Sequence, residues 1–349
     1  MSSQTAEDLR GLDPASVEAA LRDSIPGLGD GPMGVEMIAG GQSNPTFFLR
    51  FANRDLVLRK QPPGKLLPSA HAVDREYRVM KALADTPVPV PEMLLYCDDA
   101  SVTGTPFYVM ERVPGRVFHD SALPGMDPDH RRACYASMTD TLAALHDVDV
   151  DAVGLSDYGR PGNYFERQIR RWTRQYRADQ EEAGSNMPEA ERLIEWLPAN
   201  MPEDDGMTGL CHGDYRIGNL MFHPTEPRVV AVLDWELSTL GHPLADLGYT
   251  LMFWRMTPDE YGGLAGLDLP ALGLPTAEEH VARYFEKRGL PNSMMPFHEV
   301  FALFRFAMIL EGVAARARRG NAASADALEV GGRARAFAQR AVHIIETRG

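Results

Sequence analysis

Three side chains near the middle of the sequence have the types and spacing that phosphoryl transfer needs. Asp214 lies in the segment HGDYRIGN, Asn219 ends that segment, and Asp234 follows an apolar run in VVAVLD. An aspartate in a tight loop can accept a proton from a hydroxyl. Carboxylate and amide oxygens are ligands that Mg²⁺ prefers, together with phosphates. Because phosphoryl transfer depends on positioning and charge neutralisation, this set predicts Asp214 as a base and Asn219 and Asp234 as magnesium ligands.

The elements that must position these side chains change in type along the chain. Strands are expected at 35–38, 46–51, 56–59, 94–97 and 107–110, and a buried strand at 229–234. Helices are expected at 14–21, 74–84, 131–146, 165–180, 193–197, 244–254, 278–288 and 299–319. The pattern predicts an α+β fold of two lobes with a cleft between them. Its predicted parts are a helical extension at 1–29, a small antiparallel β-rich N-lobe at 30–112 and a larger, mainly helical C-lobe at 113–349.

The composition excludes several classes of protein. Lys+Arg 35 minus Asp+Glu 49 gives a net charge of −14, which argues against general nucleic-acid binding. The three cysteines lie far apart and form neither a disulfide framework nor a zinc motif. The first residues lack the basic and apolar regions of a signal peptide, and no apolar run is long enough to span a membrane. We therefore expect a cytoplasmic protein that acts on a small molecule, with no nucleic-acid or membrane partner.

The pattern HxDxxxxN, with an aspartate fifteen residues further on, resembles the catalytic loop of protein kinases. The HGD form followed by LDWE is similar to the aminoglycoside phosphotransferase and choline kinase branch of the protein-kinase-like fold. The segments LCHGDYRIGNLMFHP, VAVLDWE and LRKQPPGKLLPSAHAVDREY resemble the phosphotransferase module that some organisms fuse to acyl-CoA dehydrogenases. The resemblance implies a bilobal kinase-like fold, ATP and Mg²⁺ as cofactors, and an alcohol group as the acceptor.

The resemblance also implies a set of nucleotide-binding residues in the N-lobe. Arg59 stands where the family has a strand-borne basic residue, usually lysine, and Glu76 stands at the position of its acidic partner. Alternate residues of a strand share a face, so Arg59 points with Val57, at the adenine position, and Lys60 points away. The alternatives are a surface strand residue for Arg59 and a solvated helix face for Glu76. The other expected nucleotide contacts are Gly41, Ser43, Asn44, Glu111 and Val113.

Three residues near the catalytic aspartate have roles that the resemblance implies. Asp246, in GHPLADLG, is expected to brace the catalytic loop by accepting backbone hydrogen bonds. His212 is expected to be a buried packing residue rather than a proton shuttle. Arg216 stands where many protein kinases carry a lysine, which suits it to neutralise the transferred phosphate. A salt bridge to a nearby acid is the alternative for Arg216.

The segment 163–180 bears on the acceptor. Two stripes recur there at helical spacing: apolar Phe165, Ile169, Trp172 and Tyr176, and basic Arg167, Arg170, Arg174 and Arg177. One interpretation is a solvated helix paired with acids elsewhere. The other is an anion site in which Arg170, Arg174 and Trp172 meet the acceptor. A polycationic aminoglycoside prefers an acidic pocket, so the stripe favours a hydroxyacyl compound or its CoA ester. An aminoglycoside phosphotransferase and a non-catalytic nucleotide-binding regulator are the alternatives.

Overall fold

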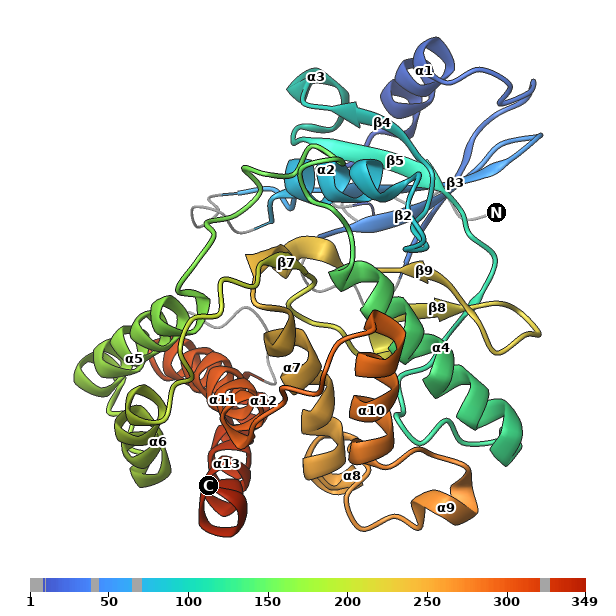
Figure 1. The fold of residues 1–349 in the computed structure, drawn as a ribbon. Coiled ribbons are helices and arrows are strands. Elements are labelled where there is room, and N and C mark those ends of the chain that lie inside the picture. Colours follow the sequence, from blue (N-terminus) through green and yellow to red (C-terminus); the bar gives the residue numbers. More distant parts are fainter. Residues whose placement is uncertain (1–8, 10, 39–43, 65–70, 321–326) are drawn as a thin grey trace. The chain divides into compact units, whose positions relative to one another are not determined.

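The computed structural model describes residues 9, 11–38, 44–64, 71–320 and 327–349 (Figure 1). The chain divides into two compact units. The first consists of residues 1–115 with 230–237, and the second of residues 116–229 with 238–349. The chain therefore passes between the units more than once, because residues 230–237, which follow the catalytic loop, belong to the first unit.

The first unit is built on a five-stranded antiparallel sheet with the strand order β1-β2-β3-β5-β4. Its strands are β1 (Gly34–Met37), β2 (Thr46–Arg50), β3 (Asp55–Lys60), β4 (Met93–Cys97) and β5 (Phe107–Glu111). Its helices are α1 (Pro14–Ser24), α2 (Val73–Leu83) and α3 (Ala100–Thr103). The predicted strands and the predicted helix at 74–84 are confirmed to within one residue at each end.

Alternation along the strands gives the sheet two different faces. One face packs with α1 around Phe47, Leu49 and Leu56 in a single apolar cluster. Lys60 points away from Val57 as predicted, and its Nζ donates a 2.7 Å hydrogen bond to the carbonyl oxygen of Thr103. Because successive side chains of β3 point to opposite faces of the sheet, Val57 and Arg59 lie together on the other face.

Residues 230–237 pack on the same unit. The N–H of Val232 donates to the carbonyl oxygen of Pro89 at 2.9 Å, and the 3₁₀ turn η2 (Trp235–Leu237) contacts α2. The predicted strand at 229–234 is present as β9 (Val229–Val232) but ends before Asp234. Asp234 has a φ of 64°, in the left-handed region that aspartate adopts more readily than most residues. This turn ends the strand and presents the carboxylate.

The second unit is mainly helical. Its helices are α4 (Pro128–His146), α5 (Tyr164–Ala183), α6 (Pro188–Ala199), α7 (Pro243–Arg255), α8 (Pro258–Tyr261), α9 (Leu269–Leu272), α10 (Ala277–Arg288), α11 (Pro296–Arg318), α12 (Ala327–Gly332) and α13 (Ala334–Arg348). Short elements around the catalytic loop are β6 (Arg116–Val117), β7 (Gly209–Cys211), η1 (Ile217–Asn219), β8 (Leu220–Phe222) and β10 (Thr239–Gly241). Strand β7 pairs with β10, and β6 pairs with β8, both antiparallel. The predicted helices are all present; these short strands were not predicted.

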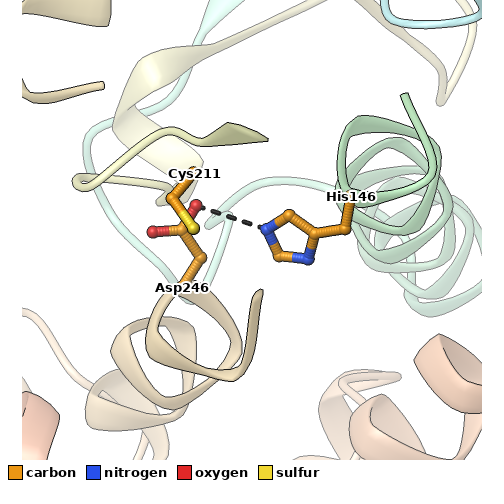
Figure 2. Close-up of side chains that lie close together, drawn as sticks. All are labelled: His146, Cys211 and Asp246. Atoms are coloured by element: carbon orange, nitrogen blue, oxygen red, sulfur yellow. Dashed lines mark hydrogen bonds and ion pairs between the residues drawn. The ribbon is translucent and has the colours of Figure 1, made fainter. Parts of the chain in front are cut away.

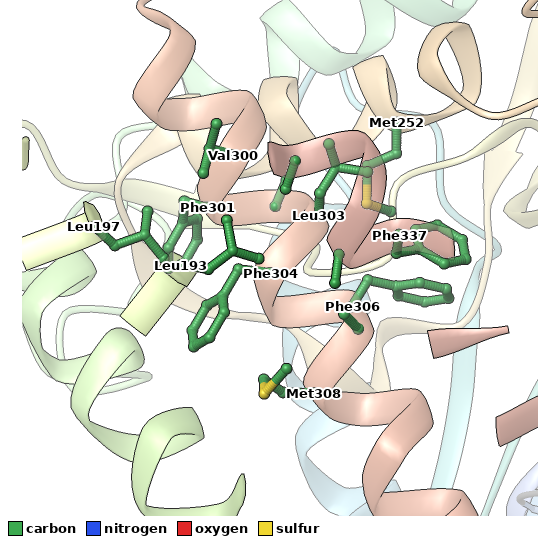
Figure 3. Packing of buried hydrophobic residues seen from close by; sticks show 14 of the residues in the cluster. Leu193, Leu197, Met252, Val300, Phe301, Leu303, Phe304, Phe306, Met308 and Phe337 are labelled. Carbon is green, nitrogen blue, oxygen red and sulfur yellow. The ribbon is translucent and has the colours of Figure 1, made fainter. Parts of the chain in front are cut away.

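Helix α11 forms the centre of this unit and contacts α5, α7, α12 and α13. Figure 3 shows Phe301, Leu303 and Phe304 of α11 packed among side chains of the neighbouring helices. A glycine is required where α7 approaches α11, because a Cβ on Gly248 would lie 2.5 Å from the carbonyl oxygen of His298. The close approach holds the two helices in a fixed register. Within the described ranges, no helix combines the length and the apolar character needed to cross a bilayer.

Candidate active site

The catalytic loop follows β7 and is held in shape by hydrogen bonds to its backbone. Asp246 of α7 accepts the N–H groups of His212 and Gly213, at 2.6 and 2.9 Å. Arg305 of α11 donates to the carbonyl oxygen of Gly213 at 3.0 Å. His212 is fully buried, and its Nδ1 accepts the N–H of Asp214 at 3.2 Å. Asp246 thus makes contacts of the kind that the resemblance implied. His212 is buried and hydrogen-bonded, and its role as a packing and hydrogen-bonding residue rather than a proton shuttle stays a prediction.

Two further buried side chains, His146 and Cys211, lie close to Asp246. Figure 2 shows His146, Cys211 and Asp246 close together, with His146 Nε2 3.4 Å from Asp246 Oδ2. The hydroxyl oxygen of Tyr284 lies 2.7 Å from Nδ1 of His146, within hydrogen-bond distance. A His–Cys–Asp group can hold a metal, but burial raises the pKa of the Cys211 thiol well above its ordinary value. Both oxygens of Asp246 already accept backbone N–H groups, so the cluster supports the loop rather than a metal.

The carboxylate of Asp214 is held through both of its oxygens. Asn219 Nδ2 donates to Oδ2 at 2.7 Å and to the backbone oxygen of Asp214 at 2.8 Å. The hydroxyl of Tyr249 donates to Oδ1, and Arg216 Nε lies 3.4 Å from the same oxygen. The contact of Arg216 is the salt bridge that the sequence left open as an alternative. A carboxylate oriented in this way is suited to meet an incoming hydroxyl.

Sequence reasoning missed two residues that touch the catalytic loop, Tyr249 and Arg305. Tyr249 is buried, and burial together with the charge of Asp214 raises the pKa of its phenol well above the ordinary value. It therefore stays a hydrogen-bond donor. One signal was available, because Tyr249 lies three residues after Asp246 and so on the same face of α7. Arg305 is the one charged residue in the otherwise apolar stretch 300–310, VFALFRFAMIL, which was also a signal.

In the first unit, Arg59 lies between two acids. Its Nε is 3.1 Å from Glu76 Oε2, and its Nη2 donates to Asp234 Oδ1 at 2.8 Å. The predicted pairing of Arg59 with Glu76 is therefore present, and both side chains are largely buried. Glu76 also accepts a hydrogen bond from the hydroxyl of Tyr108 at 3.1 Å. Burial raises the pKa of Glu76 to about 7, against the lowering effect of Arg59.

Asn44 makes a side-chain contact that the sequence did not predict. Its side chain is fully buried, and its Nδ2 donates to Oε1 of Glu76 at 2.9 Å. Its Oδ1 lies 3.1 Å from Nδ1 of His71. The side-chain amide therefore orients Glu76, and the expected phosphate contact of Asn44, through backbone N–H groups, stays a prediction. The expected contacts Gly41 and Ser43 lie outside the described residues.

At the expected hinge, after strand β5, the described residues leave one backbone N–H group without a hydrogen-bond partner. The N–H of Glu111 donates to the carbonyl oxygen of Glu92 at 3.0 Å, so this amide is already used. The N–H of Val113 has no hydrogen-bond partner among the described residues. Val57 is buried on the same face as Arg59. The adenine contacts of Val57, Glu111 and Val113 stay predictions.

The apolar stripe of α5 faces the helical core. Phe165, Ile169 and Tyr176 are buried in the cluster around α11, and Trp172 is half-buried against it. The indole Nε1–H of Trp172 is buried and has no partner among the described residues. The stripe is therefore mainly structural, with one unused donor at Trp172.

The basic stripe of α5 divides into two pairs. Arg177 forms an ion pair with Glu191 at 2.6 Å, and Arg167 donates to backbone carbonyls before the helix. Arg170 and Arg174 are exposed, and neither has a partner among the described residues. The solvated-helix interpretation thus accounts for Arg167 and Arg177, and leaves two cations one turn apart.

Asn219 and Asp234 each keep a side-chain oxygen that could bind a cation. Asn219 uses its Nδ2 on Asp214, and its Oδ1 has no partner within the described ranges. Asp234 uses Oδ1 on Arg59, and the described residues supply no partner for its Oδ2. Amide and carboxylate oxygens are the donors that Mg²⁺ prefers, so each side chain, taken within its own unit, is of a type that fits the metal.

Comparison with known proteins agrees with this geometry. Residues 34–273 match the model of a phosphotransferase enzyme family. The chain belongs to this family. The chain is 47% identical over 305 residues to mouse acyl-CoA dehydrogenase family member 10, a match that covers 86% of this chain. It spans only 28% of that relative's length.

Solved structures place the phosphotransferase among kinase-like folds. A protein from Ralstonia eutropha, provisionally described as an aminoglycoside phosphotransferase, has a TM-score of 0.87 and 46% identity, covering 97% of this chain and 99% of that one. An aminoglycoside phosphotransferase solved with AMP-PNP and hygromycin B has a TM-score of 0.61 and 15% identity, covering 93% of this chain and 98% of that one, which shows the fold alone. The predicted α+β kinase-like fold and the resemblance to the dehydrogenase-fused module are confirmed.

Proposed function

We propose that this phosphotransferase moves the γ-phosphate of ATP to a hydroxyl group of a small molecule. The observation that carries the proposal is the Asp214 carboxylate, held on both oxygens by Asn219 and Tyr249. In this proposal Asp214 orients the attacking hydroxyl and accepts its proton. Arg216, beside the same carboxylate, neutralises charge on the transferred phosphate.

The nucleotide and the metal have candidate partners among the remaining free groups. We assign Asn219 Oδ1 and Asp234 Oδ2 to Mg²⁺, which when bound neutralises charge on the phosphates. Arg59 keeps its Nη1 free of partners among the described residues, and we assign this group to the α/β-phosphates. Glu76 holds the guanidinium in place, as an acid on α2 does in the family it resembles.

For the acceptor we propose an anionic or acyl molecule, such as a hydroxyacyl compound or its CoA ester. Arg170 and Arg174 supply two unpaired cations, which suit a carboxylate or phosphate. Trp172, whose ring is half-buried, is kept as a candidate contact of the acceptor through its ring, because its indole N–H is buried. The relationship to a protein named as an acyl-CoA dehydrogenase family member points in the same direction. The description of the Ralstonia eutropha protein supports the second candidate, an aminoglycoside.

The test is a substrate panel with ATP and Mg²⁺, read by mass for the gain of one phosphate. Hydroxyacyl-CoA esters, free hydroxy acids and kanamycin form the panel, and Asp214→Ala is assayed beside the wild type. The proposal expects phosphorylation of a hydroxyacyl compound that Asp214→Ala loses. Phosphorylation of kanamycin alone would establish the aminoglycoside activity. Nucleotide binding without any turnover, by a protein that is folded, would favour the regulator.

A further inference from the structure

A cavity of about 410 Å³ lies in the second unit, at the N-terminal ends of three helices. Helices α5, α7 and α11 and the segment 201–208 surround it. Asp214, Arg216 and Asn219 are absent from its described lining. Gly241 lines it and pairs with Gly209, at the end of β7 that is remote from the catalytic loop. The cavity is therefore separate from the groups to which the proposed function assigns the chemistry.

The inner wall is apolar and aromatic. Tyr164, Phe165 and Leu244 line it and are buried. The ring of Phe165 lies 4.9 Å from that of His242, between centroids, and packs edge-on against Phe297. Small-molecule sites are typically cavities of about 300–1,000 Å³ with apolar walls and a few convergent polar groups. The volume and the wall of this cavity meet that description.

His298 supplies the polar group of the inner wall. Its side chain is 2% exposed, and its Nδ1 accepts the N–H of Met295 at 3.0 Å. The proton of the neutral ring is therefore on Nε2, which has no hydrogen-bond partner among the described residues. Burial, with His242 nearby, lowers the pKa of His298 to about 4, so the ring is neutral at pH 7. A buried N–H donor that lines a cavity without a partner indicates a missing acceptor.

His242 fixes the second polar wall. Its Nδ1 accepts the N–H of Leu244 at 3.2 Å, and its Nε2 lies 3.3 Å from Asp205 Oδ1. The rings of His242 and His298 are stacked, with centroids 6.0 Å apart. His242 is thus committed to Asp205, and His298 is the histidine left to meet a ligand.

The mouth of the cavity carries negative charge. Its lining contains the carboxylates of Glu166, Glu203, Asp204 and Asp205, and its described residues include no lysine or arginine. Asp204 accepts the N–H groups of Asn163 and Gly206, at 2.8 and 3.0 Å. Glu166 and Glu203 have no partner among the described residues. Two unpaired carboxylates beside an apolar wall favour a cation with an apolar body.

We propose that this cavity binds a small organic ammonium that has an aromatic or apolar body and one hydrogen-bond acceptor. The body packs on Tyr164, Phe165 and Leu244, and the acceptor receives the Nε2–H of His298. The ammonium lies at Glu166 and Glu203. The site goes beyond the proposed function, because it shares no residue with the phosphoryl-transfer groups.

The test uses three probes of one shape: tyramine, its neutral alcohol analogue tyrosol, and the anion 3-(4-hydroxyphenyl)propanoate. Calorimetric titration of the full chain is expected to give saturable tyramine binding with a Kd near about 1 mM, as suits so small a ligand. The alcohol and the anion are expected to bind at least about tenfold more weakly. Equal binding of the three probes, or no saturation by tyramine at about ten times that concentration, would overturn the proposal.

Variants locate the binding. His298→Phe keeps a ring and removes the N–H, and it is expected to weaken tyramine about tenfold, whereas the exposed His343→Phe leaves binding unchanged. Glu166→Gln with Glu203→Gln changes exposed residues only, and is expected to bring tyramine and tyrosol to similar affinity. Asp214→Ala is expected to bind tyramine like the wild type, whatever its activity. Loss of binding in Asp214→Ala, or full binding in both cavity variants, would contradict the assignment.

Discussion

Arg59 donates a 2.8 Å hydrogen bond to Asp234, a residue 175 positions further along the chain. The same guanidinium faces Glu76 through Nε at 3.1 Å. A planar fork can meet two carboxylates at once, whereas a lysine ammonium is a single point charge. The pairing gives a physical reason for arginine at a position where the family usually has lysine. It also brings Asp234 into the first unit.

Replacing the guanidinium of Arg59 by the ammonium of a lysine tests its pairing with Glu76 and Asp234. Arg59→Lys is expected to keep part of the activity and to raise KM for ATP about tenfold, because one of the two acids loses its partner. Arg112→Lys is the matched control, since Arg112 pairs with Asp55 on the same sheet, exposed to solvent. Steady-state kinetics and thermal unfolding of both variants give the comparison. A KM unchanged in Arg59→Lys would remove the fork from nucleotide binding.

Tyr249 is expected to act through the carboxylate it holds. Tyr249→Phe should lower kcat about tenfold, with little change in KM for ATP, because it removes one donor from Asp214. Tyr135→Phe is the control: it removes a buried hydroxyl that donates to the carbonyl oxygen of Ser121. Steady-state kinetics separate kcat from KM. Equal loss of kcat in both variants would mean that Tyr249 only stabilises the fold.

The magnesium assignment makes a prediction about nucleotide affinity. Asp234→Asn should weaken ATP binding about tenfold or more in the presence of Mg²⁺ and much less in its absence, because one ionised oxygen ligand is lost. The matched control is Glu236→Gln, two residues away and 4.0 Å from Arg59. Titration of ATP with and without the metal measures both affinities. The same loss with and without Mg²⁺ would assign Asp234 to the support of Arg59 instead.

The two unpaired arginines of α5 can be tested together. Replacing Arg170 and Arg174 by alanine should raise KM for an anionic acceptor while KM for ATP stays nearly the same, the signature of lost substrate binding. Arg177→Ala is the control, because Arg177 is already paired with Glu191. Kinetics with the acceptor found in the panel measure both constants. An unchanged acceptor KM would show that these cations face solvent in the working enzyme.

His298 makes stability depend on pH. Burial lowers its folded pKa to about 4, whereas the unfolded value is about 6.5. Between these values the unfolded chain binds more protons, so the free energy of unfolding falls as pH drops, by up to about 1.4 kcal/mol per unit. His298→Asn keeps an acceptor for the N–H of Met295 and does not titrate. Denaturant unfolding of the wild type and of His298→Asn is measured from neutral to acidic pH. The difference between their free energies of unfolding should shrink as the pH falls. A difference that stays constant would exclude His298 as the source of the pH dependence.

Residue types and their spacing were enough to predict the reactive side chains and the order of the helices and strands. Asp214, Asn219 and Asp234 occur within one short stretch, and their spacing depends on a loop and a hairpin that local residues specify. The strands of the first unit follow from alternation and from the breaks around them, so their ends were predicted to within one residue. Val57 and Lys60 lie on opposite faces of the sheet because side chains alternate between the two faces along a strand.

Contacts between side chains that are distant in the sequence depend on how the helices and strands pack. The side chain of Asn44 contacts Glu76, and Tyr249 contacts Asp214. Neither contact could be predicted from the sequence, because both partners come from other elements. The basic stripe of α5 looks uniform in sequence, yet Arg177 is paired by α6 and Arg174 is not. Helical spacing says which residues share a face but not what lies opposite. That depends on how the helices pack, and packing is set by shape and volume across the whole core.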